Sequence, residues 1–206
     1  EKIILYGSGR TDSGVHALGQ SAHFISKVKI NKKFTFINTI NFFLRKKKIS
    51  ILQVRSRKKN FHARYSAKKR FYKYIIINRI ASLSLDANKA WHVKSILDVK
   101  LIKKAAKFLE GTKDFSTYRS SSCGAKSPVK TLEEVIVKKK ASEISMTFKS
   151  KSFLQHQVRS MVGCLKYVGE KKWSIKKFKD VMNSKKRTNC APPAPAQGLY
   201  LQKIKY

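Results

Sequence analysis

Near the start of the chain, a loop bounded by glycines presents two charged side chains, Arg10 and Asp12. Residues 2–6 before the loop and residues 19–25 after it have the apolar or alternating patterns typical of strands. The three glycines in this loop permit positive φ angles and a close approach of the backbone to a ligand. We therefore interpret Asp12 as a candidate reactive group rather than a core residue.

Two familiar phosphate-binding loops do not fit this stretch. The dinucleotide-binding pattern needs a glycine where Asp12 stands, and a carboxylate there would repel a pyrophosphate. The Walker pattern needs Lys and then Ser or Thr after Gly14, but Val15 and His16 follow. A structural alternative stays open, namely a solvated turn in which Asp12 caps a nearby backbone amide.

Composition points to a partner that is a polyanion. The 206 residues include 47 Lys and Arg against 11 Asp and Glu, which gives a net charge of +36. Nucleic acid is the first candidate and an anionic membrane surface the second. Because Lys is abundant throughout, many solvated lysines on an ordinary enzyme surface are the alternative. No apolar run approaches the roughly 20 residues of a membrane helix, so we expect no membrane-spanning segment.

Cysteine and histidine usage predicts a reducing compartment and no metal site. The three cysteines and five histidines are scattered along the sequence without zinc-ligand spacing. An odd number of cysteines argues against a disulfide framework. We expect a cytoplasmic protein without a bound metal. Because the chain begins with a charged residue and strand-like sequence rather than Met, we also expect that an N-terminal segment is missing.

Between the loop and residue 77, residue periodicity predicts one helix and two further strands. Apolar residues recur at helical spacing between 34 and 44, which predicts a core-facing helix capped by Asn31. Residues 49–54 and 70–77 are predicted to be strands. The second strand places Arg70, Tyr72 and Tyr74 on one side, which suits base stacking and phosphate neutralisation. A half-buried sheet face with tyrosines at its edge is the alternative.

The remaining two thirds predict helices alternating with strands. A helix beginning at Ser95 or Asp98 and ending near Gly111 carries an apolar stripe. A hairpin is expected over residues 132–148, with its turn at 138–140, and a final strand follows Gly198. Helices are also predicted from residue 153 and, with Ser174 as the cap, over the segment that contains Ile175, Phe178 and Val181.

Arg159 neighbours the buried stripe of the helix predicted from residue 153. An arginine there is costly to desolvate unless a carboxylate or phosphate meets it. The alternative is an ordinary arginine whose stem packs on apolar surface while its head stays in water.

Taken together, these segments resemble the tRNA pseudouridine synthase A family. Five stretches carry the resemblance, occur in the family's order and run nearly end to end: Gly9-Arg10-Thr11-Asp12-Ser13-Gly14-Val15-His16-Ala17, Phe61-His62-Ala63-Arg64, Arg70-Phe71-Tyr72-Lys73-Tyr74, residues 153–163, and Ala194-Pro195-Ala196-Gln197-Gly198-Leu199. The resemblance implies an enzyme that isomerises uridine to pseudouridine in the tRNA anticodon stem-loop, as a homodimer without a metal or organic cofactor.

The resemblance also implies roles for four residues. Asp12 is the nucleophile, Tyr72 packs on the target base and assists proton removal, and Arg159 pairs with the catalytic carboxylate. Arg10 moves into the space that the flipped uridine leaves. Phe71 is a mild departure from the family's Arg-x-Tyr-x-Tyr pattern.

The resemblance implies an α+β fold, the two-lobed pseudouridine synthase fold. We expect an antiparallel-rich mixed sheet flanked by helices, with a basic RNA-binding cleft that has Asp12 at its base. Residues 1–79 form the N-terminal lobe, which contains the catalytic loop and the Arg-x-Tyr-x-Tyr strand, and residues 80–206 form the C-terminal lobe. The family's N-terminal strand and helix, with a Tyr-Asp-Gly…Gly-Trp-Gln motif, are not in the sequence. A truncated or non-catalytic tRNA-binding protein is therefore the alternative function.

Overall fold

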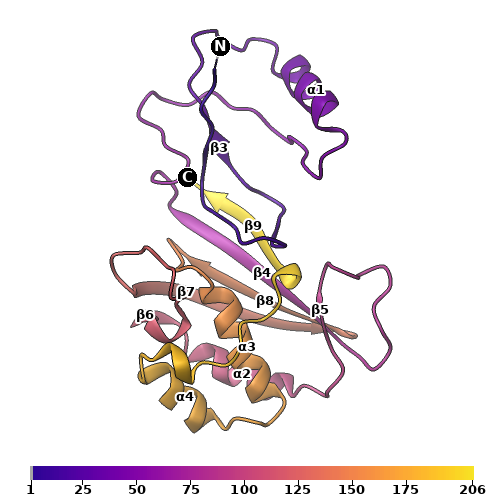
Figure 1. Ribbon diagram of the computed structural model, residues 1–206, viewed down its shortest axis with the longest axis vertical. Coiled ribbons are helices and arrows are strands. Elements are labelled where there is room, and N and C mark those ends of the chain that lie inside the picture. The colour runs from indigo at the N-terminus through magenta and orange to yellow at the C-terminus, as the bar shows by residue number, and fades with distance from the viewer. Residues whose placement is uncertain (1) are drawn as a thin grey trace.

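The computed structural model describes residues 2–206 and contains one large mixed sheet (Figure 1). Its strand order is β2-β9-β4-β8-β7-β6, and β5 pairs with β4. The β2–β9 and β4–β5 pairs are parallel, and the other pairs of this sheet are antiparallel. The strands are β2 (His16–Ala17), β4 (Lys69–Asn78), β5 (Trp91–Val93), β6 (Gly111–Asp114), β7 (Val129–Lys140), β8 (Glu143–Ser150) and β9 (Leu199–Lys205). The predicted α+β class with an antiparallel-rich mixed sheet is confirmed.

Strand β4 lies in the centre of the sheet, between β8 and β9. Tyr74 and Ile76 are fully buried on the face that also carries Met146 and Phe148 of β8. Along β8, half-buried and buried residues alternate strictly, as expected for a strand with one face against the core. The predicted hairpin is confirmed, but β7 continues through residues 138–140, and the turn falls at 141–142.

Three helices cover one face of the large sheet, below it in Figure 1, and enclose the main core. They are α2 (Val99–Lys107), α3 (Gln157–Gly169) and α4 (Ile175–Asn183). Asp98 caps α2 by accepting a hydrogen bond from the Leu101 amide, and Ser174 caps α4 through the Lys177 amide. Helix α2 ends at Lys107, so Gly111 is not its cap; it begins β6 with a φ of 98°.

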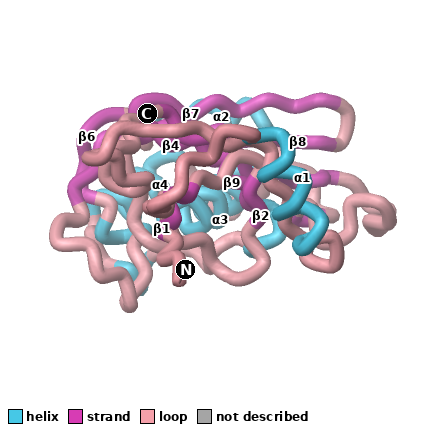
Figure 2. The backbone as a smooth tube through the Cα atoms, turned by 90° about the horizontal axis from the view of Figure 1, so that it is seen from above, coloured by secondary structure: helices cyan, strands magenta, loops and turns pink. Residues whose placement is uncertain are grey.

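The N-terminal part lies on the other side of the sheet from these helices in Figure 1. It contains the two-stranded sheet of β1 (Tyr6–Gly7) and β3 (Ala22–His23) and the helix α1 (Lys33–Leu44). Figure 2 views the molecule from above, so that this N-terminal part lies nearest the viewer. The predicted division into two lobes after residue 79 stays a prediction. Strand β4 ends at Asn78 and pairs with β8 and β9, which both belong to the C-terminal part.

Two expectations for this part were wrong. Helix α1 begins at Lys33, so Asn31 precedes its N-cap position and caps nothing with its side chain. Residues 49–54 form no strand, because the Ile51 backbone is satisfied by the Asn41 side chain instead: the Ile51 amide donates to Asn41 Oδ1 at 2.7 Å. The Asn41 amide group in turn donates to the Ile51 carbonyl at 3.0 Å.

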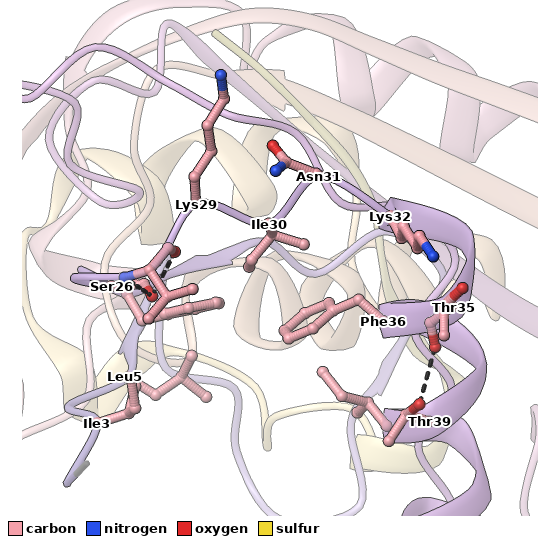
Figure 3. A pocket seen from close by; sticks show the side chains of 13 residues that line it. Ile3, Leu5, Ser26, Lys29, Ile30, Asn31, Lys32, Thr35, Phe36 and Thr39 are labelled. Atoms are coloured by element: carbon pink, nitrogen blue, oxygen red, sulfur yellow. Dashed lines mark hydrogen bonds between the residues drawn. The ribbon is translucent and has the colours of Figure 1, made fainter.

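The apolar face of α1 is not core either. None of the residues of this helix is buried, and Phe34 and Phe43 are more than three quarters exposed. Instead, Phe36 and Ile40 line an apolar cavity of about 730 Å³ together with Ile3 and Leu5 of the strand-like start (Figure 3). The helical pattern thus forms the helix, but no second layer among residues 2–206 buries its apolar face.

None of the helices in the described part is long and apolar enough to cross a bilayer.

Tyr118 stands out within the main core. Its ring is fully buried, and its hydroxyl has no hydrogen-bond partner among residues 2–206. Burial raises its pKa well above the ordinary value of 10.0, and the nearby Cys164 and Cys190 add to the rise. The stability that comes from keeping this phenol neutral is present below pH 10 and is lost as the pH rises further, because the unfolded chain then ionises it.

We expect Tyr118→Phe to raise the free energy of unfolding at pH 7 by about 1 kcal/mol, since it removes a buried unpaired hydroxyl. It should also weaken the loss of stability above about pH 10. Urea unfolding at both pH values measures this. Tyr74→Phe is the matched control, because the Tyr74 hydroxyl donates to the Pro195 carbonyl at 2.7 Å and its loss should destabilise the protein. A comparable loss in both variants would contradict the prediction.

Candidate active site

The glycine-bounded loop contains a tight turn at Asp12. The Val15 amide donates to the Asp12 carbonyl at 3.1 Å, and Gly14 has a positive φ of 78°. Ser8 is buried at the base of the loop, where its hydroxyl donates to Gln20 Oε1 at 2.5 Å. The turn is therefore closed by backbone hydrogen bonds and leaves the Asp12 side chain free for other contacts.

The Asp12 carboxylate forms an ion pair with Arg159 of α3. Arg159 Nη1 donates to Asp12 Oδ2 at 2.7 Å across 147 residues of sequence. The Arg159 side chain is only 15% exposed and Asp12 is 25% exposed, so the pair is shielded from water more than a surface salt bridge. Both structural alternatives are thereby wrong: Asp12 caps no backbone amide in the described chain, and the Arg159 head lies against a carboxylate.

A second interaction fixes the arginine from the other side. Arg159 Nε donates to the Ala194 carbonyl at 2.8 Å, and the Ala194 amide donates to the Arg159 carbonyl at 3.0 Å. The segment around Ala194 approaches α3 this closely because residue 163 is a glycine: a Cβ there would lie 2.1 Å from the Pro192 carbonyl oxygen. The guanidinium is thus preorganised before any ligand arrives.

His156 also contacts the carboxylate, with its Nε2 atom 3.2 Å from Asp12 Oδ2. It occupies the N-cap position of α3 with a left-handed φ of 63°, a region that histidine enters more readily than most residues other than glycine. Residues 153–156 precede the helix, which begins at Gln157, although the helix was expected from residue 153. Two groups thus converge on one oxygen of Asp12.

Tyr72 of β4 is half-buried and lies near this ion pair. Its ring packs edge-on against Phe153 with a centroid distance of 5.1 Å. Burial raises its pKa above the ordinary value, and the negative charge of Asp12 adds to the rise while Arg70 opposes it. The side chain is therefore a neutral phenol near neutral pH, which suits packing against a base better than accepting a proton.

Arg10, by contrast, is exposed on the loop. Its side chain makes no hydrogen bond or ion pair with any residue in the range 2–206. The structure therefore brings Asp12 and Arg159 together and places Tyr72 nearby. The Arg10 guanidinium lies exposed on the loop, outside this pair.

No metal-binding cluster of His, Cys, Asp and Glu occurs among the described residues.

Two cysteines that are far apart in sequence lie in contact, with Cys164 Sγ 3.4 Å from Cys190 Sγ. Burial and contact with Cys190 raise the pKa of Cys164, and the Cys164 contact and Arg187 lower that of Cys190.

Comparison with known proteins decides the family. A family model described as "tRNA pseudouridine synthase" matches residues 105–206. The tRNA pseudouridine synthase A of Pelagibacter ubique is 56% identical over 206 residues, which is 100% of this chain and 84% of the relative. The enzymes of that name from Parvibaculum lavamentivorans and Maricaulis maris are each 42% identical, over 100% and 99% of this chain and 83% and 82% of the relatives.

This chain belongs to the tRNA pseudouridine synthase A family. It is thus a member of an enzyme family that isomerises uridine to pseudouridine. Among the residues that contact Asp12 in this synthase, sequence reasoning found Arg159 but missed His156. A signal was available on the helix predicted from residue 153, where His156 and Arg159, three residues apart, would share one side; the observed contact comes from the N-cap position instead.

We expect Gly163→Ala to impair the synthase by moving the arginine. The new Cβ forces the 192–194 segment away from α3, which should cost about 1–3 kcal/mol of stability. The displaced Arg159 should lower kcat roughly tenfold or more. Thermal unfolding and turnover measure the two effects.

Gly124→Ala is the matched control for this prediction, because no atom lies within 4 Å of a Cβ built there. It should change neither stability nor turnover. If Gly163→Ala behaved like this control, the close approach of the 192–194 segment would not position Arg159.

Proposed function

We propose that this synthase isomerises uridine to pseudouridine in the anticodon stem-loop of tRNA, with Asp12 as the nucleophile. The observation that carries the proposal is the shielded ion pair between Asp12 and Arg159, which lies near the half-buried Tyr72. An ionised carboxylate on a glycine-bounded loop, held by one arginine, is what covalent catalysis by an aspartate requires.

The reaction conserves atoms. The bond between ribose C1′ and uracil N1 breaks, the uracil turns, and a bond forms between C1′ and C5. The proton leaves C5, and N1 gains a proton. Asp12 acts either by adding to the base or by trapping the sugar carbon, and both routes need an ionised carboxylate.

The surrounding residues divide the remaining tasks. Arg159 orients the Asp12 carboxylate through the charge-assisted hydrogen bond to Oδ2. No described residue donates a hydrogen bond to Oδ1, so this oxygen is the one we assign to the attack. The neutral ring of Tyr72 holds the detached base while it turns, and the exposed Arg10 occupies the space left by the flipped uridine.

The charge of the chain supports an RNA substrate. A net charge of +36 attracts the tRNA backbone and should make binding fall steeply with salt. We include in the proposal a basic RNA-binding cleft with Asp12 at its base, a homodimer and a cytoplasmic location, which rest on the family resemblance. The alternative, a truncated or non-catalytic tRNA-binding protein, is disfavoured by the intact Asp12–Arg159 pair.

Tritium release from tRNA labelled at uracil C5 tests the proposal, because forming pseudouridine transfers that tritium to water. We expect release by the unmodified protein and none by Asp12→Ala or the isosteric Asp12→Asn. Both variants should still bind tRNA, since they remove a single negative charge from a strongly basic protein.

Release that persists in both Asp12 variants would overturn the nucleophile assignment. Tight binding without release by the unmodified protein would favour the binding-only alternative. The uridines that lose tritium, mapped along the tRNA, test the anticodon stem-loop assignment.

A further inference from the structure

The Phe61-His62-Ala63-Arg64 motif has no part in the site described above. The structure places it against the two-stranded sheet that precedes the Asp12 loop. There His62 joins an aromatic cluster, which we define as Tyr6, His23, His62 and Tyr65.

The rings of the aromatic cluster contact one another in succession. Tyr6 stacks on His23 with centroids 5.0 Å apart and an interplanar angle of 21°. His23 and His62 lie 4.7 Å apart, and His62 and Tyr65 lie 4.4 Å apart. Phe61 supports the cluster edge-on against His23, at 6.0 Å. Each ring is therefore held in place by its neighbours.

Although it is well supported on one side, the cluster is open to solvent on the other. Tyr65 is 74% exposed and Tyr6 is 41% exposed. The ring of Tyr65 thus contributes little to a core, yet it lies over a fixed imidazole rather than moving freely. Supported aromatic rings that face water are what nucleobases stack on in single-stranded RNA sites.

The two imidazoles are fixed in one tautomer by backbone amides. His23 Nδ1 accepts from the Ala63 amide at 3.1 Å, and His62 Nδ1 accepts from the Arg64 and Tyr65 amides at 3.1 and 3.4 Å. A nitrogen that accepts carries no proton, so each neutral ring has its N–H at Nε2. No acceptor within residues 2–206 bonds either Nε2 atom, so both N–H groups are available to a ligand.

One guanidinium fixes the cluster to the Asp12 loop. Arg70 Nη2 donates to the Ser8 carbonyl at 3.0 Å and to the Arg64 carbonyl at 2.8 Å. Tyr6 immediately precedes Gly7, where the loop begins, and pairs with His23 across the β1–β3 ladder. The cluster is thus attached to the catalytic loop from two directions and keeps a fixed position relative to Asp12.

We propose that the aromatic cluster binds an unpaired nucleobase of the substrate RNA adjacent to the target uridine. The base stacks on Tyr65, and the Nε2–H groups of His23 and His62 donate to acceptors on the base or its phosphate. This inference rests on the proposed function, because it takes the RNA bound at Asp12 as its ligand. It assigns the Phe61-His62-Ala63-Arg64 motif to substrate binding outside the reacting centre.

Substitution of Tyr65 tests the stacking. We expect Tyr65→Ala to raise KM for the labelled tRNA roughly 5- to 150-fold, the range for loss of one stacked base, with kcat nearly unchanged. Tyr65→Phe keeps the ring and should retain the KM of the unmodified protein. Phe34→Ala is the matched control, because it removes an aromatic ring that is 77% exposed but lies outside the cluster.

A direct readout uses a stem-loop RNA that carries the fluorescent base 2-aminopurine at single unpaired positions. At the position that stacks on Tyr65, the unmodified protein and Tyr65→Phe should quench the fluorescence, and Tyr65→Ala should not. Equal KM in Tyr65→Ala and the unmodified protein, or equal quenching at every position, would overturn the inference. Asp12→Ala separates the two proposals: its continued tritium release would refute the nucleophile, whatever the Tyr65 variants show.

Discussion

The contact between Asp12 and Arg159 is the constraint on which the site depends. It joins a loop at the start of the chain to a helix 147 residues later, so both must be placed before the site exists. Removing one partner of a shielded pair leaves the other charge uncompensated, which costs far more than an exposed salt bridge contributes. The position of Arg159 in turn depends on Ala194, and that contact depends on the absence of a side chain at Gly163.

Strand β4 connects this pair to the rest of the molecule. Three of its residues, all on one side of the strand, contact different parts of the molecule. Arg70 donates to the Ser8 carbonyl of the loop, Tyr72 lies near the ion pair, and Tyr74 is buried in the main core. A central strand is suited to this, because hydrogen bonds on both sides hold its side chains at fixed spacing. Strand β4 thereby holds the loop, the Asp12–Arg159 pair and the main core at fixed positions relative to one another.

The sequence predicted what local patterns and motifs determine. The amphipathic helix capped by Asp98, the β7–β8 hairpin and the tyrosine-bearing strand follow from periodicity and capping, which are local. The pairing of Arg159 with the catalytic carboxylate was implied by the family resemblance, because the residues alone left an ordinary arginine with its head in water as an alternative. By contrast, the exposed face of α1, the Asn41–Ile51 hydrogen bonds and the His156 contact depend on which distant segments meet. Periodicity predicts which face of a helix is apolar, but it does not predict which segment packs on that face.

The most direct test of the account is the single-turnover rate of tritium release by Arg159→Met and Arg159→Lys, measured alongside tRNA affinity. If the arginine holds Asp12 in its reactive state, Arg159→Met should lose roughly 100-fold or more in rate, corresponding to about 3 kcal/mol. Arg159→Lys should recover only part of it, because a lysine cannot bind Asp12 and Ala194 together. Affinity for tRNA should change little. An Arg159→Met rate within a factor of about three of the unmodified protein would contradict the account.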